Sequence, residues 1–171
     1  MNTVTKWVNK IITNFLIVLM AAIVLDVSWQ VFTRFILKNP SSYTEELAGF
    51  LLIWIGVLGA SYALYTKAHL GIDVLTYKLT GFKKQIVEIL IYTTVIFFAF
   101  FVMVIGGINL VKLTLTLNQI SPGLNIKMGY VYLVVPFSGL LMIFYSAGFI
   151  VNAVQNRPGK SVPGHQVSAL D

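Results

Sequence analysis

Hydrophobic residues fall into four long runs along this chain, at about residues 11–35, 47–65, 86–111 and 128–154. Each run is long enough to cross a bilayer, which takes about 20 residues in a helix. Within the third run, from Ile91 to Ile105, hydrophobic and polar residues do not alternate, as they would in the strands of a membrane barrel. The pattern therefore predicts an all-α integral membrane protein with four transmembrane helices.

The composition leaves no room for a separate soluble domain. Hydrophobic residues make up 57% of the 171 residues and charged residues only 11%, whereas a soluble domain carries about 25% charged residues. We therefore expect residues 1–155 to form one transmembrane domain. The first run is longer than the apolar segment of a signal peptide, so we expect it to be a retained span. Residues 156–171 contain repeated proline and glycine, which predicts a disordered tail.

The basic residues indicate how the spans are oriented. If the amino terminus lies in the cytoplasm, the cytoplasmic segments carry eight lysines and arginines, and the outer segments carry four. Cytoplasmic loops of membrane proteins are enriched in basic residues, so this division predicts that both termini, and the tail, are cytoplasmic. The same rule accounts for the net charge of +6 without a nucleic-acid partner.

The connection between the second and third runs has an amphipathic pattern of its own. Ile72, Leu75, Leu79 and Phe82 follow one another at helical spacings of three, four and three. This predicts a short helix over about residues 70–82 that lies in the inner membrane interface. We expect four polar residues to anchor this segment, with the first two on its solvated face: His69, Asp73, Lys83 and Lys84.

Polar residues interrupt the first run near its outer end. Asp26, Gln30 and Arg34 are spaced by four and therefore share one helix face. A carboxylate is costly to bury in a membrane, so Asp26 is either a proton or ion site or a hydrogen-bonded structural anchor, and the anchor is favoured. We expect Arg34 either to reach lipid headgroups or, preferably, to pair with Glu45 or Glu46 across the short outer turn.

The second and fourth runs carry signals for helix ends and helix contacts. Ser42 to Glu45 fits a capping box, in which the two side chains satisfy free backbone amides. Gly56 and Ala60 are four residues apart and allow another helix to approach closely, whether it comes from this chain or from a partner. Pro136 removes one backbone hydrogen bond and predicts a kink in the fourth helix.

Few residues point to chemistry. The chain has no cysteine, and its two histidines, His69 and His165, lie outside the four runs, so the spans offer no haem or thiolate ligands. Phosphate-binding and nucleophile motifs are also missing from the sequence. We therefore expect no enzyme activity, cofactor or metal. Two functions remain: an accessory or scaffold subunit, which is favoured, and a small self-assembling carrier that uses Asp26 as its ion-coupling site.

A series of motifs in fixed order resembles one known family. The motifs are Trp29, Phe32 and Arg34 in the first run, then Thr44-Glu45-Glu46, Trp54, Gly59-Ala60, His69, Ile72-Asp73, Ser121-Pro122, Tyr130 and Pro136. From Trp7 to Val154, their order, their spacing and the four-span layout resemble the small membrane subunit of tripartite ATP-independent periplasmic (TRAP) transporters. Tyr43 departs from the pattern, because a tryptophan is expected there, but it keeps an aromatic side chain.

The resemblance implies partners and a cargo. It implies a large multi-spanning membrane subunit that holds the substrate and sodium sites, and a soluble periplasmic substrate-binding protein. Transport is then secondary and sodium-driven, and imports organic acids such as C4-dicarboxylates or sialic acids across the bacterial inner membrane. The small subunit would brace the elevator-like large subunit and help to dock the binding protein.

Under this interpretation, the singled-out residues serve structure and subunit assembly and do not contact the substrate. Membrane lipids are the remaining neighbours of the chain. The residues in question are Asp26, Gln30, Arg34, Glu45, Glu46, Gly56 and Ala60.

Overall fold

Helices make up almost all of the computed structural model, which describes residues 3–38, 42–66 and 82–155. The elements are α1 (Thr3–Phe35), α2 (Ser42–Tyr65), α4 (Phe82–Phe98), the π-helix η1 (Ala99–Gly106), α5 (Gly107–Thr116), α6 (Met128–Tyr132) and α7 (Val134–Gln155). Within these residues, four segments are long and apolar enough to cross a membrane. They are α1, α2, the continuous rod α4–η1–α5, and α6 with α7, so the prediction of four helical spans is confirmed.

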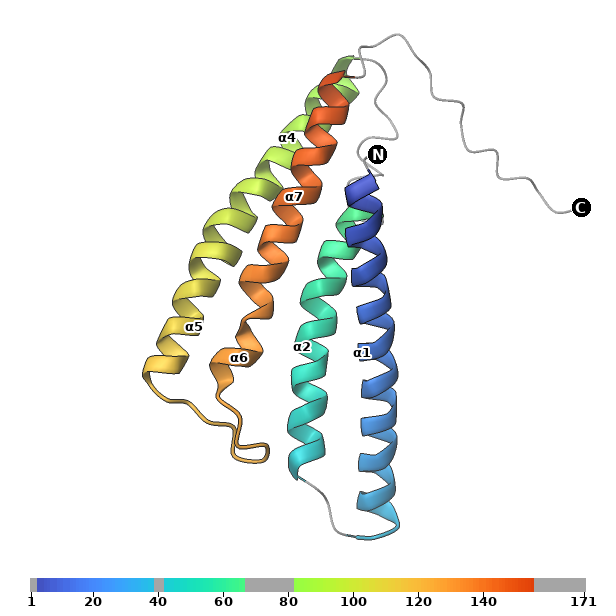
Figure 1. Cartoon of the computed structure of the whole chain (residues 1–171), viewed down its shortest axis with the longest axis vertical. Coiled ribbons are helices and arrows are strands. Elements are labelled where there is room, and N and C mark those ends of the chain that lie inside the picture. Colours follow the sequence, from blue (N-terminus) through green and yellow to red (C-terminus); the bar gives the residue numbers. More distant parts are fainter. Residues whose placement is uncertain (1–2, 39–41, 67–81, 156–171) are drawn as a thin grey trace, which may run out of the picture.

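The spans stand side by side in an open row (Figure 1). Helix α1 packs against α2, α2 packs against α7, and α7 packs against α4 and η1, which places α1 and the α4–η1–α5 rod at the two edges. The start of α1 and the end of α7 lie at the same end of the row (Figure 1). We call the opposite end, which carries the α5–α6 connection, the distal end. An orientation with both termini in the cytoplasm stays a prediction.

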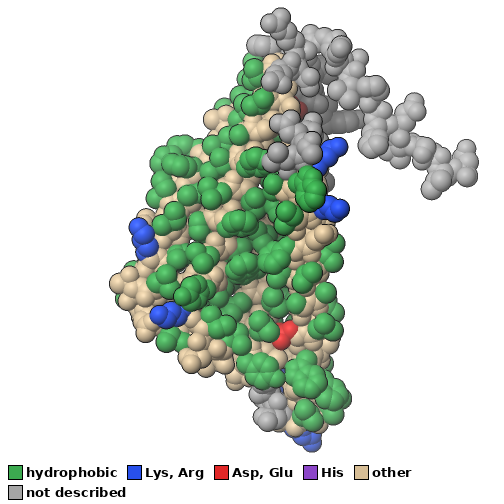
Figure 2. Space-filling model, in the orientation of Figure 1, with side chains coloured by type: hydrophobic (Ala, Val, Ile, Leu, Met, Phe, Trp, Pro, Cys, Tyr) green, Lys and Arg blue, Asp and Glu red, His purple; other side chains and the backbone are tan. Residues whose placement is uncertain are grey.

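An open row leaves much apolar surface uncovered. Figure 2 shows one face of the molecule, on which hydrophobic side chains cover most of the area and basic side chains lie near its margins. A buried hydrophobic cluster lies nearer the termini and joins one residue from each span: Ile12, Leu64, Tyr92 and Tyr145. Lipid tails are as apolar as the exposed hydrophobic side chains. The uncovered surface of the row is therefore stable in a membrane or against another membrane protein.

The fourth span is interrupted close to Pro136, as the sequence predicts. Helix α6 ends at Tyr132 and α7 begins at Val134. Because proline has no amide hydrogen, Pro136 makes no bond to the carbonyl four residues earlier. The indole of Trp54 on α2 donates a 3.1 Å hydrogen bond to the Val131 carbonyl next to this break.

The third span contains an eight-residue π-helix that the sequence pattern does not predict. It faces the interrupted part of the fourth span at very short range. A Cβ atom added to Gly107 would lie 2.9 Å from Cδ of Pro136, and one added to Gly139 would lie 2.8 Å from Cβ of Met103. Glycine at these two positions therefore allows the two spans to touch.

The glycines of α2 are in open space instead. A Cβ atom added to Gly56 would have no heavy atom within 4 Å, so the contact that Gly56 and Ala60 predict is not made at Gly56 within the described part of this chain. The alternative, a contact with a partner chain, stays open. The predicted interfacial helix lies outside the described residues except at its end, where α4 begins with Phe82. The predicted tail, residues 156–171, lies outside them entirely.

Candidate functional site

The carboxylate of Glu46 joins the two halves of the row at the distal end. Glu46 lies at the start of α2, and its Oε1 accepts a 2.9 Å hydrogen bond from the Gly123 amide. Its Oε2 accepts a 3.1 Å bond from the Leu124 amide and a further bond from the hydroxyl of Ser121. Charge-assisted bonds of this kind are stronger than bonds between neutral groups, so Glu46 fastens the α5–α6 connection to α2.

The α5–α6 connection is itself ordered by backbone bonds. Ile120 and Lys127 form an antiparallel bridge, and the Ser121 amide donates a 2.9 Å bond to the Ile126 carbonyl. Asn125 has a φ of 55°, a left-handed conformation that asparagine adopts more readily than most residues. Gly123 fits tightly, since an added Cβ atom would lie 3.0 Å from the Glu46 carboxylate. The connection therefore presents a fixed shape at the distal end.

Arg34 and the two glutamates do not come together as expected. Among the described residues, no ion pair joins Arg34 to Glu45 or Glu46, and both Arg34 and Glu45 are exposed. The reason is that the Glu46 carboxylate turns to the amides of the α5–α6 connection. Arg34 instead lies in the last turn of α1, where its charge complements the negative end of the helix dipole.

Aromatic residues join α1 and α2 near the distal end. The indole of Trp29 donates a 3.3 Å hydrogen bond to the hydroxyl of Tyr43, and Trp29 stacks on Phe32 with ring centroids 5.6 Å apart. Tyr43 is the position at which the family resemblance leads us to expect tryptophan, and a tyrosine hydroxyl supplies the acceptor here. Helix α2 begins at Ser42, and the capping box that the sequence predicts there stays a prediction.

Asp26 and Gln30 lie half-buried on α1. Oδ2 of Asp26 is buried and has no hydrogen-bond partner within the described part of the chain. The Gln30 carbonyl accepts a 2.9 Å bond from the hydroxyl of Thr33. No group of three or more carboxylate or imidazole side chains gathers in the described segments.

A buried pair of serines holds α2 to α7. The hydroxyls of Ser61 and Ser138 lie 2.5 Å apart, and the Ser138 hydroxyl also lies 2.8 Å from the Val57 carbonyl. Both serines are fully buried. This pair was not predicted from the sequence. Serines within apolar runs are the signal for it, because such side chains hydrogen-bond between membrane helices.

The side chains of the four predicted interfacial anchors are not among those that the structure describes. His69 and Asp73 lie outside the described residues. Lys83 and Lys84 fall within the first turn of α4, but only their backbone is described. Their anchoring role stays a prediction.

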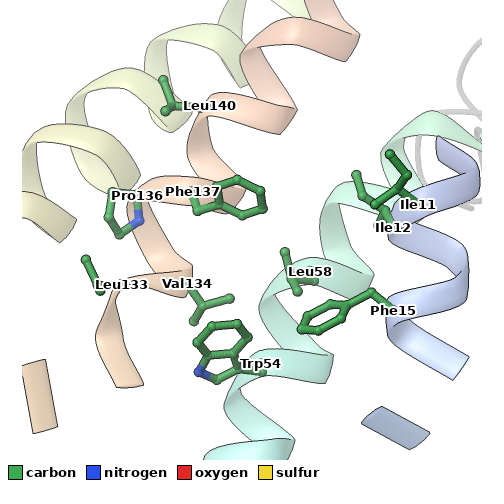
Figure 3. A pocket seen from close by; sticks show the side chains of 10 residues that line it. All are labelled: Ile11, Ile12, Phe15, Trp54, Leu58, Leu133, Val134, Pro136, Phe137 and Leu140. Atoms are coloured by element: carbon green, nitrogen blue, oxygen red, sulfur yellow. The ribbon is translucent and has the colours of Figure 1, made fainter. Parts of the chain in front are cut away.

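An apolar groove of about 580 Å³ runs between α1, α2 and the fourth span. Figure 3 shows the side chains of α1 and of the α6–α7 segment on its two sides, with those of α2 between them. The residues that line it are Ile11, Ile12, Phe15, Trp54, Leu58, Leu133, Val134, Pro136, Phe137 and Leu140. Phe15 and Trp54 meet edge to face with ring centroids 6.1 Å apart. A groove of this composition suits an apolar side chain or acyl chain, because its lining side chains offer few polar groups to bind a polar substrate.

The fold and these contacts define a multi-pass membrane subunit whose notable sites are packing surfaces and helix-to-helix fasteners. Residues 23–156 match the family described as the DctQ component of tripartite ATP-independent periplasmic transporters. This match covers more than half of the chain, and the chain therefore belongs to that family of TRAP transporter small permease subunits.

Individual relatives agree with this assignment. The chain is 26% identical to a TRAP transporter small permease protein of Haemophilus influenzae over 142 residues. The matched segment covers 83% of this chain and 86% of the relative. The chain is 35% identical over 78 residues to the sialic acid TRAP transporter small permease protein SiaQ of Vibrio cholerae, covering 43% of this chain and 45% of that one. It is 30% identical over 134 residues to the isethionate TRAP transporter permease protein DctMQ of Oleidesulfovibrio alaskensis, covering 75% of this chain but only 21% of that longer one.

Proposed function

We propose that this chain is the fixed accessory subunit that braces the large membrane subunit of a binding-protein-dependent TRAP transporter in the bacterial inner membrane. The observation that carries the proposal is the open row of four spans, with little of its apolar surface buried within the chain. A bundle that worked alone would bury its helices against one another. A row of this kind gains its remaining contacts from another membrane protein or from lipid.

The match to DctMQ supports a large membrane partner. This chain corresponds to about a fifth of that permease protein, so most of that relative lies outside the matched segment. In the proposed complex, the large subunit holds the substrate and the coupling sodium ions. Transport is secondary and brings in an organic acid of the C4-dicarboxylate or sialic acid class, a proposal that the SiaQ relative supports.

The chain is rigid where a brace needs to be. Glu46 fixes the α5–α6 connection to α2, and the Ser61–Ser138 pair fixes α2 to α7. With both termini in the cytoplasm, the distal end faces the periplasm, where the ordered α5–α6 connection is available to help dock the soluble binding protein. Also part of the proposal are an interfacial helix over about residues 70–82 at the cytoplasmic side, anchored by His69, Asp73, Lys83 and Lys84, and a cytoplasmic tail at residues 156–171. Residues 67–81 and 156–171 lie outside the described part of the chain.

We assign the polar and small residues of the spans to structure and assembly. Glu46 acts within the chain, and Gly56 and Ala60 offer a surface on α2 to a partner helix. Asp26, Gln30, Arg34 and Glu45 lie toward the distal end of α1 and the start of α2, and none of them contacts the substrate.

Reconstitution tests the proposed function. Liposomes that contain the large subunit, this chain, the binding protein and a sodium gradient should take up the organic acid, and uptake should fall sharply when this chain is left out. Liposomes that contain this chain alone should take up none. Uptake by the chain alone would overturn the proposal in favour of the small carrier that uses Asp26.

A further inference from the structure

The face of α1 that lines the apolar groove also carries a carboxylate, that of Asp26. Phe15 lines the groove, and Asp26 follows eleven residues later, which is about three helical turns and brings it back to the same face of α1. Leu19 and Ala22 lie between them on this face, and both are half-buried. The face of α1 that begins in an apolar groove therefore ends at an acid.

This acid is incompletely satisfied. Oδ2 of Asp26 is shielded from solvent and has no hydrogen-bond partner in residues 3–38, 42–66 and 82–155. Arg34, the basic residue two turns further along α1, is exposed and forms no ion pair within the same residues. A carboxylate at this depth is costly unless a cation or several donors face it.

The groove is open along its length. Ile11, Phe137 and Leu140 line it, and each exposes more than half of its side chain, at 62%, 55% and 57%. Helices pack by inserting the side chains of one into the grooves of another. The groove thus has the shape and composition to receive the side chains of a transmembrane helix.

We propose that this face, the groove together with Asp26, receives a transmembrane helix of the large permease subunit that places a lysine or arginine against Asp26. The inference rests on the proposed function and specifies which surface of the chain carries it. Charge complementarity selects this occupant. An acyl chain would cover the groove but bring no cation, and a phosphate headgroup or the Asp26 of a second copy would bring a negative charge.

Site-specific photo-crosslinking tests where the large subunit sits. A photoreactive phenylalanine analogue at Phe137 lies in the groove, and the same analogue at Phe97 on α4 is a matched control, because Phe97 is 64% exposed and does not line the groove. In membranes that hold the whole complex, we expect a crosslink to the large subunit from position 137 and none from position 97. A crosslink from position 97 only, or crosslinks from position 137 only to lipid or to a second copy, would overturn the proposal.

Charge substitution tests the basic partner. Asp26→Asn and Asp26→Lys should lower the yield of large subunit that co-purifies with this chain by about tenfold or more, because each leaves the partner cation unpaired. Lys112→Gln and Lys112→Glu, which change an exposed charge on α5 away from the groove, should leave the yield unchanged. Replacing one lysine or arginine of the large subunit's membrane helices by glutamate should restore assembly with Asp26→Lys. Full assembly of Asp26→Lys without any second change would overturn the ion pair.

The two proposals fail in different ways. If the chain does not co-purify with the large subunit at all, the proposed function is wrong. If it co-purifies and supports uptake, but position 137 gives no crosslink to the large subunit, only the assignment of this surface is wrong.

Discussion

Glu46 and Gly123 are 77 residues apart in the chain, yet the carboxylate of Glu46 accepts a 2.9 Å hydrogen bond from the Gly123 amide. The Leu124 amide and the Ser121 hydroxyl bond to the same carboxylate. One side chain at the start of α2 therefore organises the connection between the third and fourth spans. It couples the two halves of the row at the end that we place in the periplasm.

Replacing Glu46 should loosen this end of the molecule. We expect Glu46→Ala to lower the free energy of unfolding measurably, because two backbone amides of the connection lose their acceptor. Denaturant titration of the purified chain in detergent measures the change. Glu45→Ala is the matched control, since Glu45 is exposed and its removal should change the stability little. Equal stability of the two variants would show that the Glu46 bonds do not hold the connection.

The Ser61–Ser138 pair should contribute a measurable interaction energy. A double-mutant cycle with Ser61→Ala and Ser138→Ala is expected to give a coupling of about 0.6–1.5 kcal/mol, the range typical of hydrogen bonds between membrane helices. Ser146 is a matched control. Its hydroxyl is also fully buried but has no partner in the described part of the chain, so Ser146→Ala should be neutral or stabilising. Simple additivity of the Ser61 and Ser138 substitutions would mean that the contact carries no energy.

Alanine substitutions should separate the two kinds of glycine in the spans. Gly107→Ala places a Cβ atom 2.9 Å from the rigid ring of Pro136, and we expect a loss of about 1–3 kcal/mol from overpacking. Gly56→Ala meets no atom within 4 Å and should stabilise the isolated chain by up to about 1 kcal/mol through better helix propensity. Unfolding in detergent compares the two variants. Loss of complex assembly with Gly56→Ala, at unchanged stability of the chain, would place the large subunit at α2.

The four spans and the break near Pro136 follow from the sequence because they depend on local properties. Span length is set by the thickness of the bilayer, and a missing amide hydrogen acts within one helical turn. Hydrophobic periodicity cannot say which helices are neighbours. For this reason the sequence drew attention to Gly56 and Ala60, whereas close contacts within the described part of the chain fall at Gly107, Gly129 and Gly139.

The partners of the charged residues were harder to predict for the same reason. Glu46 and Arg34 are close in sequence, and pairing across the turn is the simplest expectation. The structure instead gives Glu46 three donors from a connection more than 70 residues away. The sequence alone does not tell which distant segment folds back over a helix start. The π-helix in the third span is a further case, since nothing in its uniformly apolar sequence distinguishes it from an α-helix.

Asp26 should leave ion coupling untouched. If Asp26 serves assembly, Asp26→Asn should not change the number of sodium ions moved per substrate molecule in those complexes that still form. The position of α1 at the edge of the row supports this expectation (Figure 1). Parallel sodium and substrate fluxes into liposomes, normalised to assembled complex, measure the ratio, with Glu45→Gln as the control for a lost charge. A ratio that changes with Asp26→Asn alone would assign the carboxylate to the transport pathway and return the small-carrier hypothesis to first place.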